Sequence, residues 1–254
     1  MSQRWKLVLE FDGTPFVGWQ QQPEGLSVQQ VLEQALYRFC GEKVEAVTAG
    51  RTDSGVHALG LVVHADIPRD ASPETVLNAL NFHMKPHPVS VLSAEPVGAD
   101  FHARFSCRGR AYVYRILNRV PPPTLEWHRV WHVRRPLDAE AMHRAAQFLV
   151  GHHDFSTFRD ARCQAKSPLR TLDRLDVVRE GDVISVYTEA RSFLHHQVRN
   201  MVGTLKLVGE GKWTPDQVRE ALELRDRRAG GPTAPAHGLY FFRAVYQGLG
   251  ADGA

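Results

Sequence analysis

Strand patterns alternate with amphipathic helix patterns along this chain, and that alternation limits its possible folds more than any other feature. Apolar residues at every second position predict a strand at residues 5–11, where Leu7, Leu9 and Phe11 share one face. Residues 27–39 carry apolar residues at helical spacing behind Ser27, a residue type that caps helix N-termini. The same criteria predict further strands at 43–47, 59–67, 88–97, 108–117 and 238–246, a hairpin at 172–190 that turns at Glu180–Gly181, and helices at 72–80, 138–149, 195–208 and 214–224.

These strands lack the long uninterrupted Val, Ile and Leu runs that fill an all-parallel sheet. In the strand at 59–67, a period of two predicts that Leu59, Leu61, Val63 and Ala65 share one face. We therefore predict an α+β protein with a mainly antiparallel sheet. The second half resembles the first in layout, which indicates two lobes, residues 1–105 and 106–247, followed by a tail at 248–254.

The composition is that of a soluble globular protein, with 43% hydrophobic and 23% charged residues in 254. No run approaches the roughly 20 apolar residues of a membrane span, and the N-terminus lacks a signal-peptide pattern, so we expect a cytoplasmic protein. Three separate cysteines without a CxxC pair favour neither disulfides nor a zinc site.

Positive charge is concentrated rather than large overall. The formal net charge is only +3, yet residues 101–125 contain no Asp or Glu and include five arginines. Such a strip is typical of a nucleic-acid contact, although strand geometry excludes placing all five arginines on one face.

The segment "AGRTDSGVHALG" at residues 49–60 joins two predicted strands and contains glycines, Arg51 and Asp53. A guanidinium beside Asp53 would keep the carboxylate ionised, as a carboxylate nucleophile requires. The same residues also suit a polar turn with a surface ion pair, and local chemistry leaves both interpretations open.

Two other motifs do not support a cofactor or metal site. "GLGADG" at 248–253 matches a dinucleotide-binding pattern but has no helix after it. The histidine pairs at 152–153 and 195–196 lack the spacing that places two ligands on one helix face. We expect no cofactor and no metal.

Six segments in this order resemble the TruA-type tRNA pseudouridine synthases: "FDGTPFVGWQ", "GRTDSGVHA", "DFHARFSCRGRAYVYRI", "DFSTFR", "FLHHQVRNMVG" and "TAPAHGLY". The resemblance covers residues 7 to 246. It implies two lobes with helices on one face of the sheet and a cleft between the lobes. It also implies isomerisation of uridine to pseudouridine in the tRNA anticodon stem-loop, at positions thirty-eight to forty, without a metal or organic cofactor.

Matching positions imply the site residues. Asp53 takes the nucleophile position, attacking either the ribose or the uracil ring. Arg51 would position Asp53 or fill the gap that the flipped base leaves. The remaining substrate contacts implied by the resemblance are Tyr112, which stacks on the uracil, Arg199, and the apolar walls Leu194 and Val198.

With this resemblance, the arginine strip would contact the tRNA backbone. Arg110, in phase with Tyr112, is the first candidate, and Arg104 and Arg108 are further ones. The resemblance also implies a homodimer that binds one tRNA across both subunits. Two departures, "LNFHMKPHP" and Tyr240, affect loop shape rather than the chemistry. A tRNA-binding protein without turnover and a synthase for a different RNA remain alternatives.

Overall fold

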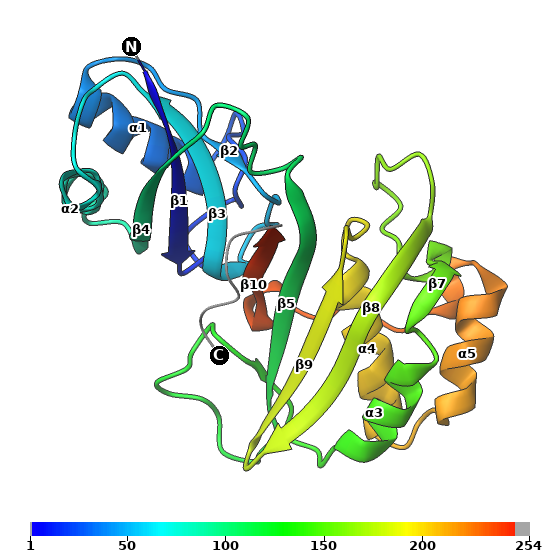
Figure 1. The fold of residues 1–254 in the computed structure, drawn as a ribbon. Helices are drawn as coiled ribbons and strands as arrows, with labels where there is room; N and C mark the ends of the chain where they lie inside the picture. The colour runs from blue at the N-terminus through cyan, green and yellow to red at the C-terminus, as the bar shows by residue number, and fades with distance from the viewer. Residues whose placement is uncertain (1, 247–254) are drawn as a thin grey trace. The chain divides into compact units, whose positions relative to one another are not determined.

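The computed structural model describes residues 2–246, so the predicted tail at 248–254 and its "GLGADG" motif lie outside the described residues. These residues form ten strands and five α-helices, a mixed fold with a mostly antiparallel sheet, as the sequence predicts (Figure 1). Hydrogen bonds connect the strands in the order β4-β1-β3-β10-β5-β9-β8-β7, with β2 paired to β3 and β6 paired to β5.

The described chain divides into two compact units. The first unit comprises residues 2–110 and 241–246, and the second comprises residues 111–240. The predicted lobe boundaries at 105/106 and 247 differ from these limits at both ends of the second unit. Strands β5 (Cys107–Leu117) and β10 (Leu239–Tyr246) each contribute residues to both units.

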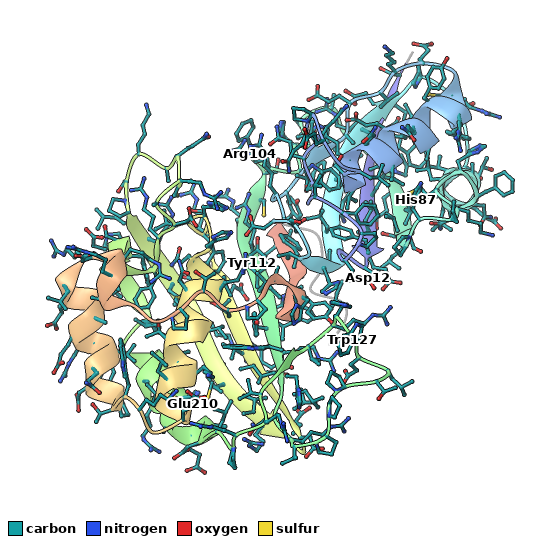
Figure 2. All side chains as sticks on the ribbon, turned by 180° about the vertical axis from the view of Figure 1, so that it is seen from behind. Asp12, His87, Arg104, Tyr112, Trp127 and Glu210 are labelled. Atoms are coloured by element: carbon teal, nitrogen blue, oxygen red, sulfur yellow. The ribbon has the colours of Figure 1, made fainter. Side chains whose placement is uncertain are left out.

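The remaining elements of the first unit are β1 (Gln3–Phe11), α1 (Val28–Cys40), β2 (Val47–Thr48), β3 (His57–Ile67), α2 (Pro73–His83) and β4 (Val89–Val97). Strand β1 pairs antiparallel with both β3 and β4. Leu7, Leu9 and Phe11 are buried on one face as predicted, and Trp5 is buried with them. Ser27 caps α1 by accepting the Gln30 amide at 3.1 Å. Helix α1 lies on one face of these strands (Figures 1 and 2).

Two predictions for the first unit are wrong in detail. Of the expected strand at 43–47, only Val47 lies in a strand, the two-residue β2. The Ala46 amide donates to the Glu33 carboxylate of α1 at 3.0 Å instead of to a neighbouring strand. Leu59 is 41% exposed rather than inward. A register shift places Leu61 opposite Leu9 but Ala58 opposite Phe11, so β3 has one extra residue there and the inward face changes phase.

The remaining elements of the second unit are β6 (Trp131–His132), α3 (Ala139–Gln147), β7 (Gly151–Asp154), η1 (Ser156–Phe158), β8 (Leu169–Glu180), β9 (Val183–Ala190), α4 (Gln197–Gly209), α5 (Pro215–Leu224), η2 (Arg227–Ala229) and η3 (Ala236–Gly238). The β8–β9 hairpin pairs Glu180 with Val183, so its turn residues are 181 and 182, one position later than predicted. Helices α3 and α4 lie on one face of β8 and β9 (Figures 1 and 2).

Local caps explain where the helices of the second unit begin. Asp138 caps α3 through the Ala141 amide, and Thr214 and Gln217 form a reciprocal capping box at α5. No helix between residues 2 and 246 combines the length and apolar character needed to cross a membrane.

Candidate active site

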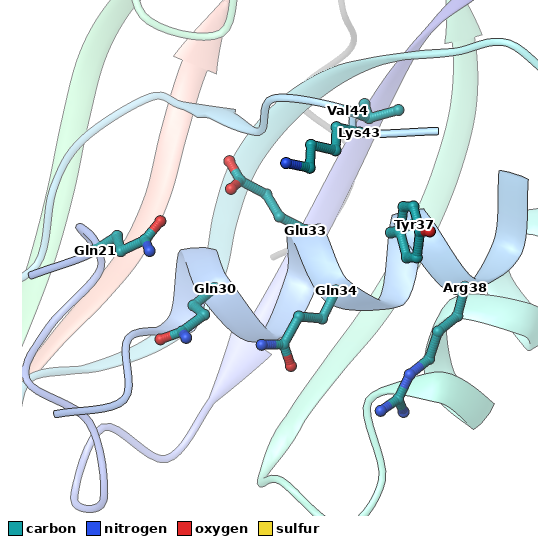
Figure 3. Close-up of a pocket in the computed structure, with 8 residues that line it drawn as sticks. All are labelled: Gln21, Gln30, Glu33, Gln34, Tyr37, Arg38, Lys43 and Val44. Carbon is teal, nitrogen blue, oxygen red and sulfur yellow. The ribbon is translucent and has the colours of Figure 1, made fainter. Parts of the chain in front are cut away.

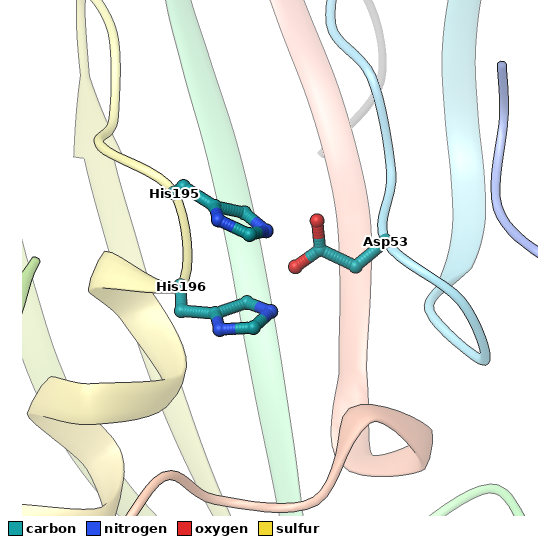
Figure 4. A group of neighbouring side chains, drawn as sticks. All are labelled: Asp53, His195 and His196. Carbon is teal, nitrogen blue, oxygen red and sulfur yellow. The ribbon is translucent and has the colours of Figure 1, made fainter. Parts of the chain in front are cut away.

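The loop from Ala49 to Val56 holds Asp53 just before β3 (Figure 4). Its backbone is fixed at both ends of the acidic turn: the Trp19 amide donates to the Thr52 carbonyl at 3.1 Å, and the Val56 amide donates to the Asp53 carbonyl at 3.1 Å. The Ser54 hydroxyl adds a bond to the Phe16 carbonyl at 3.3 Å. Asp53 is therefore half-buried on an ordered turn rather than on a loose loop.

Glycine allows the 12–18 segment to approach this turn. Gly18 has φ +111°, and a Cβ added to it would lie 2.6 Å from the Thr52 carbonyl oxygen and 3.1 Å from the Asp53 carbonyl carbon. Only glycine combines that backbone angle with that approach. The "GW" of "FDGTPFVGWQ" thus supports the loop that carries Asp53.

His57 is a residue of this region that our sequence reasoning missed. It directly follows the Asp53 turn, is 2% exposed, and its Nδ1 accepts the Gly13 amide at 2.9 Å and lies 3.3 Å from an Asp12 carboxylate oxygen. The "VH" that follows the acidic motif and the "DG" of residues 12–13 were the available signals. His57 ties together the two segments that those motifs represent.

Arg51 has an exposed side chain beside this turn. Its predicted pairing with Asp53 stays a prediction. An exposed guanidinium next to the turn is still available to an external ligand, so its substrate-binding role stays a prediction.

Arg110 has a clear local task in the first unit. Its guanidinium donates to the Ala49 carbonyl from Nε at 3.0 Å and from Nη2 at 2.8 Å, and Nη2 also donates to the Arg104 carbonyl at 3.0 Å. Arg110 thereby fixes the start of the Asp53 loop. Arg104 and Arg108 are exposed. The RNA contact expected of all three arginines stays a prediction.

The second unit contains the other predicted substrate contacts. Tyr112 on β5 is half-buried, with its ring edge-to-face against Phe193 at 5.2 Å and 87°. Leu194 and Val198 are both 4% exposed beside the start of α4. Phe193 was not among our predicted residues, although it directly precedes the "LHHQVR" motif.

Arg199 lies in the first turn of α4, where the segment 230–235 holds it. Its Nε donates to the Ala234 carbonyl at 2.7 Å, and the Ala234 amide donates back to the Arg199 carbonyl at 3.1 Å. Gly203 permits this approach, because a Cβ there would overlap the Pro232 carbonyl. The "TAPAHGLY" segment thus orients Arg199.

A carboxylate and two histidines precede α4, and sequence reasoning did not connect them. His196 Nδ1 lies 2.6 Å from Asp160, His195 Nδ1 lies 3.7 Å from it, and the two imidazoles stand 3.9 Å apart on the segment that leads into α4 (Figure 4). Partial burial acts to raise the pKa of Asp160, but the Arg162 amide and the two histidines outweigh it and lower that pKa to about 2. Asp160 is the residue directly after "DFSTFR", and this position was the only available signal.

A separate pocket of about 450 Å³ lies beside α1 in the first unit (Figure 3). Its lining is mostly polar and contains none of the predicted site residues: Gln21, Gln30, Glu33, Gln34, Tyr37, Arg38, Lys43 and Val44. Its side chains include no pairing of a nucleophile with a base. It therefore does not compete with the Asp53 loop as a catalytic candidate.

Comparison with known proteins identifies the class. The model of a family described as tRNA pseudouridine synthase matches residues 7–106 and 145–247, so this chain belongs to that family and is an isomerase. Proteins named tRNA pseudouridine synthase A are similar over almost the whole length: 65% identical in Rhodospirillum centenum, over 96% of this chain and 100% of that protein, and 61% identical in Paramagnetospirillum magneticum, over 97% and 96%. A third, from Rhodospirillum rubrum, is 57% identical over 96% of this chain and 88% of its own.

A solved chain from a crystal structure of a Cbf5–Nop10–Gar1 complex is a much more distant match. It covers 93% of this chain and 48% of its own length, with a TM-score of 0.38 and 13% identity.

Proposed function

We propose that this protein converts uridine to pseudouridine in the anticodon stem-loop of tRNA, at positions thirty-eight to forty, with Asp53 as nucleophile. One observation carries the proposal: in a chain of the tRNA pseudouridine synthase family, the ordered turn 53–56 holds a carboxylate, and Gly18 allows a neighbouring segment to pack against the backbone of that turn. A fixed carboxylate is suited to covalent catalysis, which divides one difficult step into two easier ones.

The reaction breaks the bond between ribose C1′ and uracil N1 and forms a bond between C1′ and C5. The C5 proton leaves, and N1 gains a proton, so no oxidant or reductant is consumed. The Asp53 carboxylate adds either to C1′ or to the uracil ring and then leaves. Both routes give the same balance, and neither requires a metal or an organic cofactor.

The other predicted residues receive roles that fit their surroundings. The Tyr112 ring, braced by Phe193, is suited to stack on the extracted uracil and to help remove its C5 proton. Arg199, oriented by Ala234, would hold a phosphate or the nucleophile, and Leu194 and Val198 would supply apolar walls. The exposed Arg51 suits the gap left by the flipped base.

The proposed partners follow from the same assignment. The substrate is tRNA, with Arg104, Arg108 and Arg110 at its backbone, and the working form is a cytoplasmic homodimer that binds one tRNA across both subunits.

The Asp53→Asn variant tests the proposal. It preserves size but removes the nucleophilic anion, so release of tritium from tRNA labelled at uridine C5 should fall at least about a thousandfold, with tRNA binding mostly retained. Asp70→Asn, which changes an exposed carboxylate of the same unit, is the matched control and should remain near wild type.

Turnover of Asp53→Asn near the wild-type rate would disprove the nucleophile assignment. A wild-type protein that binds tRNA but releases no tritium would favour the tRNA-binding alternative. Replacing the uridines at positions thirty-eight to forty with cytidine should abolish release. Unchanged release from that substrate would assign the enzyme to another uridine.

A further inference from the structure

The loop at residues 101–106 exposes an aromatic side chain in the arginine-rich strip. Phe105 is 77% exposed. Its ring lies 4.3 Å from the His102 ring at 31°, close to a stacked arrangement, and the Arg104 guanidinium lies 5.8 Å from its centre. Figure 2 marks Arg104 on this loop, just before β5.

A single exposed phenylalanine is ordinary on a protein surface, so the order of the loop is what matters here. Arg4 Nη1 donates to the carbonyls of Ala99 and Phe101 at 2.7 and 2.9 Å. The Tyr246 hydroxyl donates to the Ala103 carbonyl at 2.7 Å, and the Ala103 amide donates to His64 Nδ1 at 3.1 Å. The base of the loop is therefore anchored to three strands.

The tip of the loop is ordered as well. The His102 ring accepts the amides of both Arg104 and Phe105 at 3.2 Å through Nδ1, and the His102 amide donates to the Ser106 hydroxyl at 3.0 Å. These bonds turn the backbone so that Phe105 points outward with its ring against His102. An aromatic ring held in this way loses little conformational entropy when a second flat ring stacks on it.

The charge around Phe105 selects the kind of ligand. Between Asp100 and Glu126 the sequence contains no acidic residue, while Arg104 and Arg108 are exposed on either side of Phe105. Aromatic rings interleaved with arginines are the surface that binds unpaired nucleic-acid strands, since the bases stack and the phosphates pair with the cations. Among protein partners, this concentration of arginines would favour only a strongly acidic one.

We propose that Phe105, backed by His102, stacks on an unpaired base of the RNA substrate, at a nucleotide other than the uridine that is modified. This inference rests on the proposed function, because it takes RNA to be the substrate. Phe105 is thus a positioning residue for the RNA and not a catalytic one.

The test compares full-length wild type with Phe105→Ala, Phe105→Trp and Phe82→Ala. Phe82 is a matched control, since it is a 68% exposed phenylalanine in the same unit whose ring also contacts a neighbouring histidine, His83. Binding of an unmodified tRNA transcript and tritium release from labelled tRNA are measured for each. An RNA duplex without unpaired bases is the second probe.

We expect Phe105→Ala to weaken tRNA binding and raise KM roughly 10- to 100-fold, with kcat nearly unchanged. Phe105→Trp should restore binding, Phe82→Ala should match wild type, and the duplex should bind wild type and Phe105→Ala equally. Arg104→Ala should lower the slope of log Kd against log salt by about 0.7, whereas Phe105→Ala should leave that slope unchanged.

Equal tRNA binding by Phe105→Ala and Phe82→Ala, with wild-type tritium release intact, would overturn the stacking proposal and leave the proposed function standing. Wild type that releases no tritium would overturn the proposed function instead. A change in oligomer mass for Phe105→Ala without a change in RNA affinity would show that a second copy of the chain covers Phe105, which also overturns the proposal.

Discussion

Substituting Gly18 with alanine should displace Asp53 while leaving the Asp53 side chain chemically unchanged. The new Cβ would lie 2.6 Å from the Thr52 carbonyl oxygen, 3.1 Å from the Asp53 carbonyl carbon and 3.2 Å from the Ser54 amide nitrogen. Ordinary van der Waals contact begins near 3.4 Å, so the Thr52 carbonyl must move by about 0.8 Å. Because all three contacts are backbone atoms, no side-chain rotation can relieve them.

Gly18 itself has little freedom to move away. Its carbonyl accepts the Val28 amide at 3.2 Å, and the next amide, that of Trp19, donates to the Thr52 carbonyl at 3.1 Å. Trp19 is only 2% exposed. The displacement should therefore fall mainly on the 52–54 turn.

Two costs add in this variant. Forcing alanine to a φ of +111° costs about 1–3 kcal/mol in backbone strain, and overpacking costs about 1–3 kcal/mol more. A shift of the nucleophile by close to 1 Å lowers kcat roughly 100-fold. We expect a folded protein, less stable by about 2–6 kcal/mol, with kcat reduced roughly 10- to 100-fold.

Gly41→Ala is the matched control. Gly41 ends α1 with a φ of +78°, but a Cβ there would meet nothing within 4 Å. It should lose about 1 kcal/mol from backbone strain alone and keep its kcat. Urea unfolding and tritium release measure both quantities, and equal kcat values in folded Gly18→Ala and Gly41→Ala would refute the steric reasoning.

Two further predictions concern stability alone. Burial lowers the pKa of His64 in the folded protein to about 4, and its Nδ1 accepts the Ala103 amide. As pH falls, His64 therefore takes up a proton in the unfolded chain before it does so in the folded protein. The contribution of neutral His64 to the free energy of unfolding is fully present above pH 6.5 and is lost toward pH 4. Between pH 7 and 4.5, urea unfolding should show wild type losing about 2 kcal/mol more of that free energy than His64→Gln. Equal losses would disprove the assignment. Gly203→Ala should lower the free energy of unfolding by about 2–3 kcal/mol, because its Cβ overlaps the Pro232 carbonyl. The control Gly211→Ala, with open space around the new Cβ, should lower it by only about 1 kcal/mol. A loss of similar size in both variants would contradict that explanation.

The sequence by itself determined the features that depend on near neighbours. Helix starts were predictable because Ser27, Asp138 and Thr214 bond to amides three residues ahead. Strand faces were predictable wherever the period of two was unbroken, as at Leu7 and Leu9. Resemblance across six ordered segments also indicated the family, which the comparisons confirm.

Only the tertiary structure decided the features that depend on distant residues. The extra residue in β3 turns Leu59 outward, since pairing with β1 sets the register. The Arg110 guanidinium donates to the Ala49 carbonyl, 61 residues away in the sequence, and thereby fixes the start of the Asp53 loop. Spacing along the chain specifies which backbone groups can bond to near neighbours. A long, flexible arginine side chain can instead bond to any carbonyl or carboxylate that the fold brings within reach, so its partner is set only when the chain has folded.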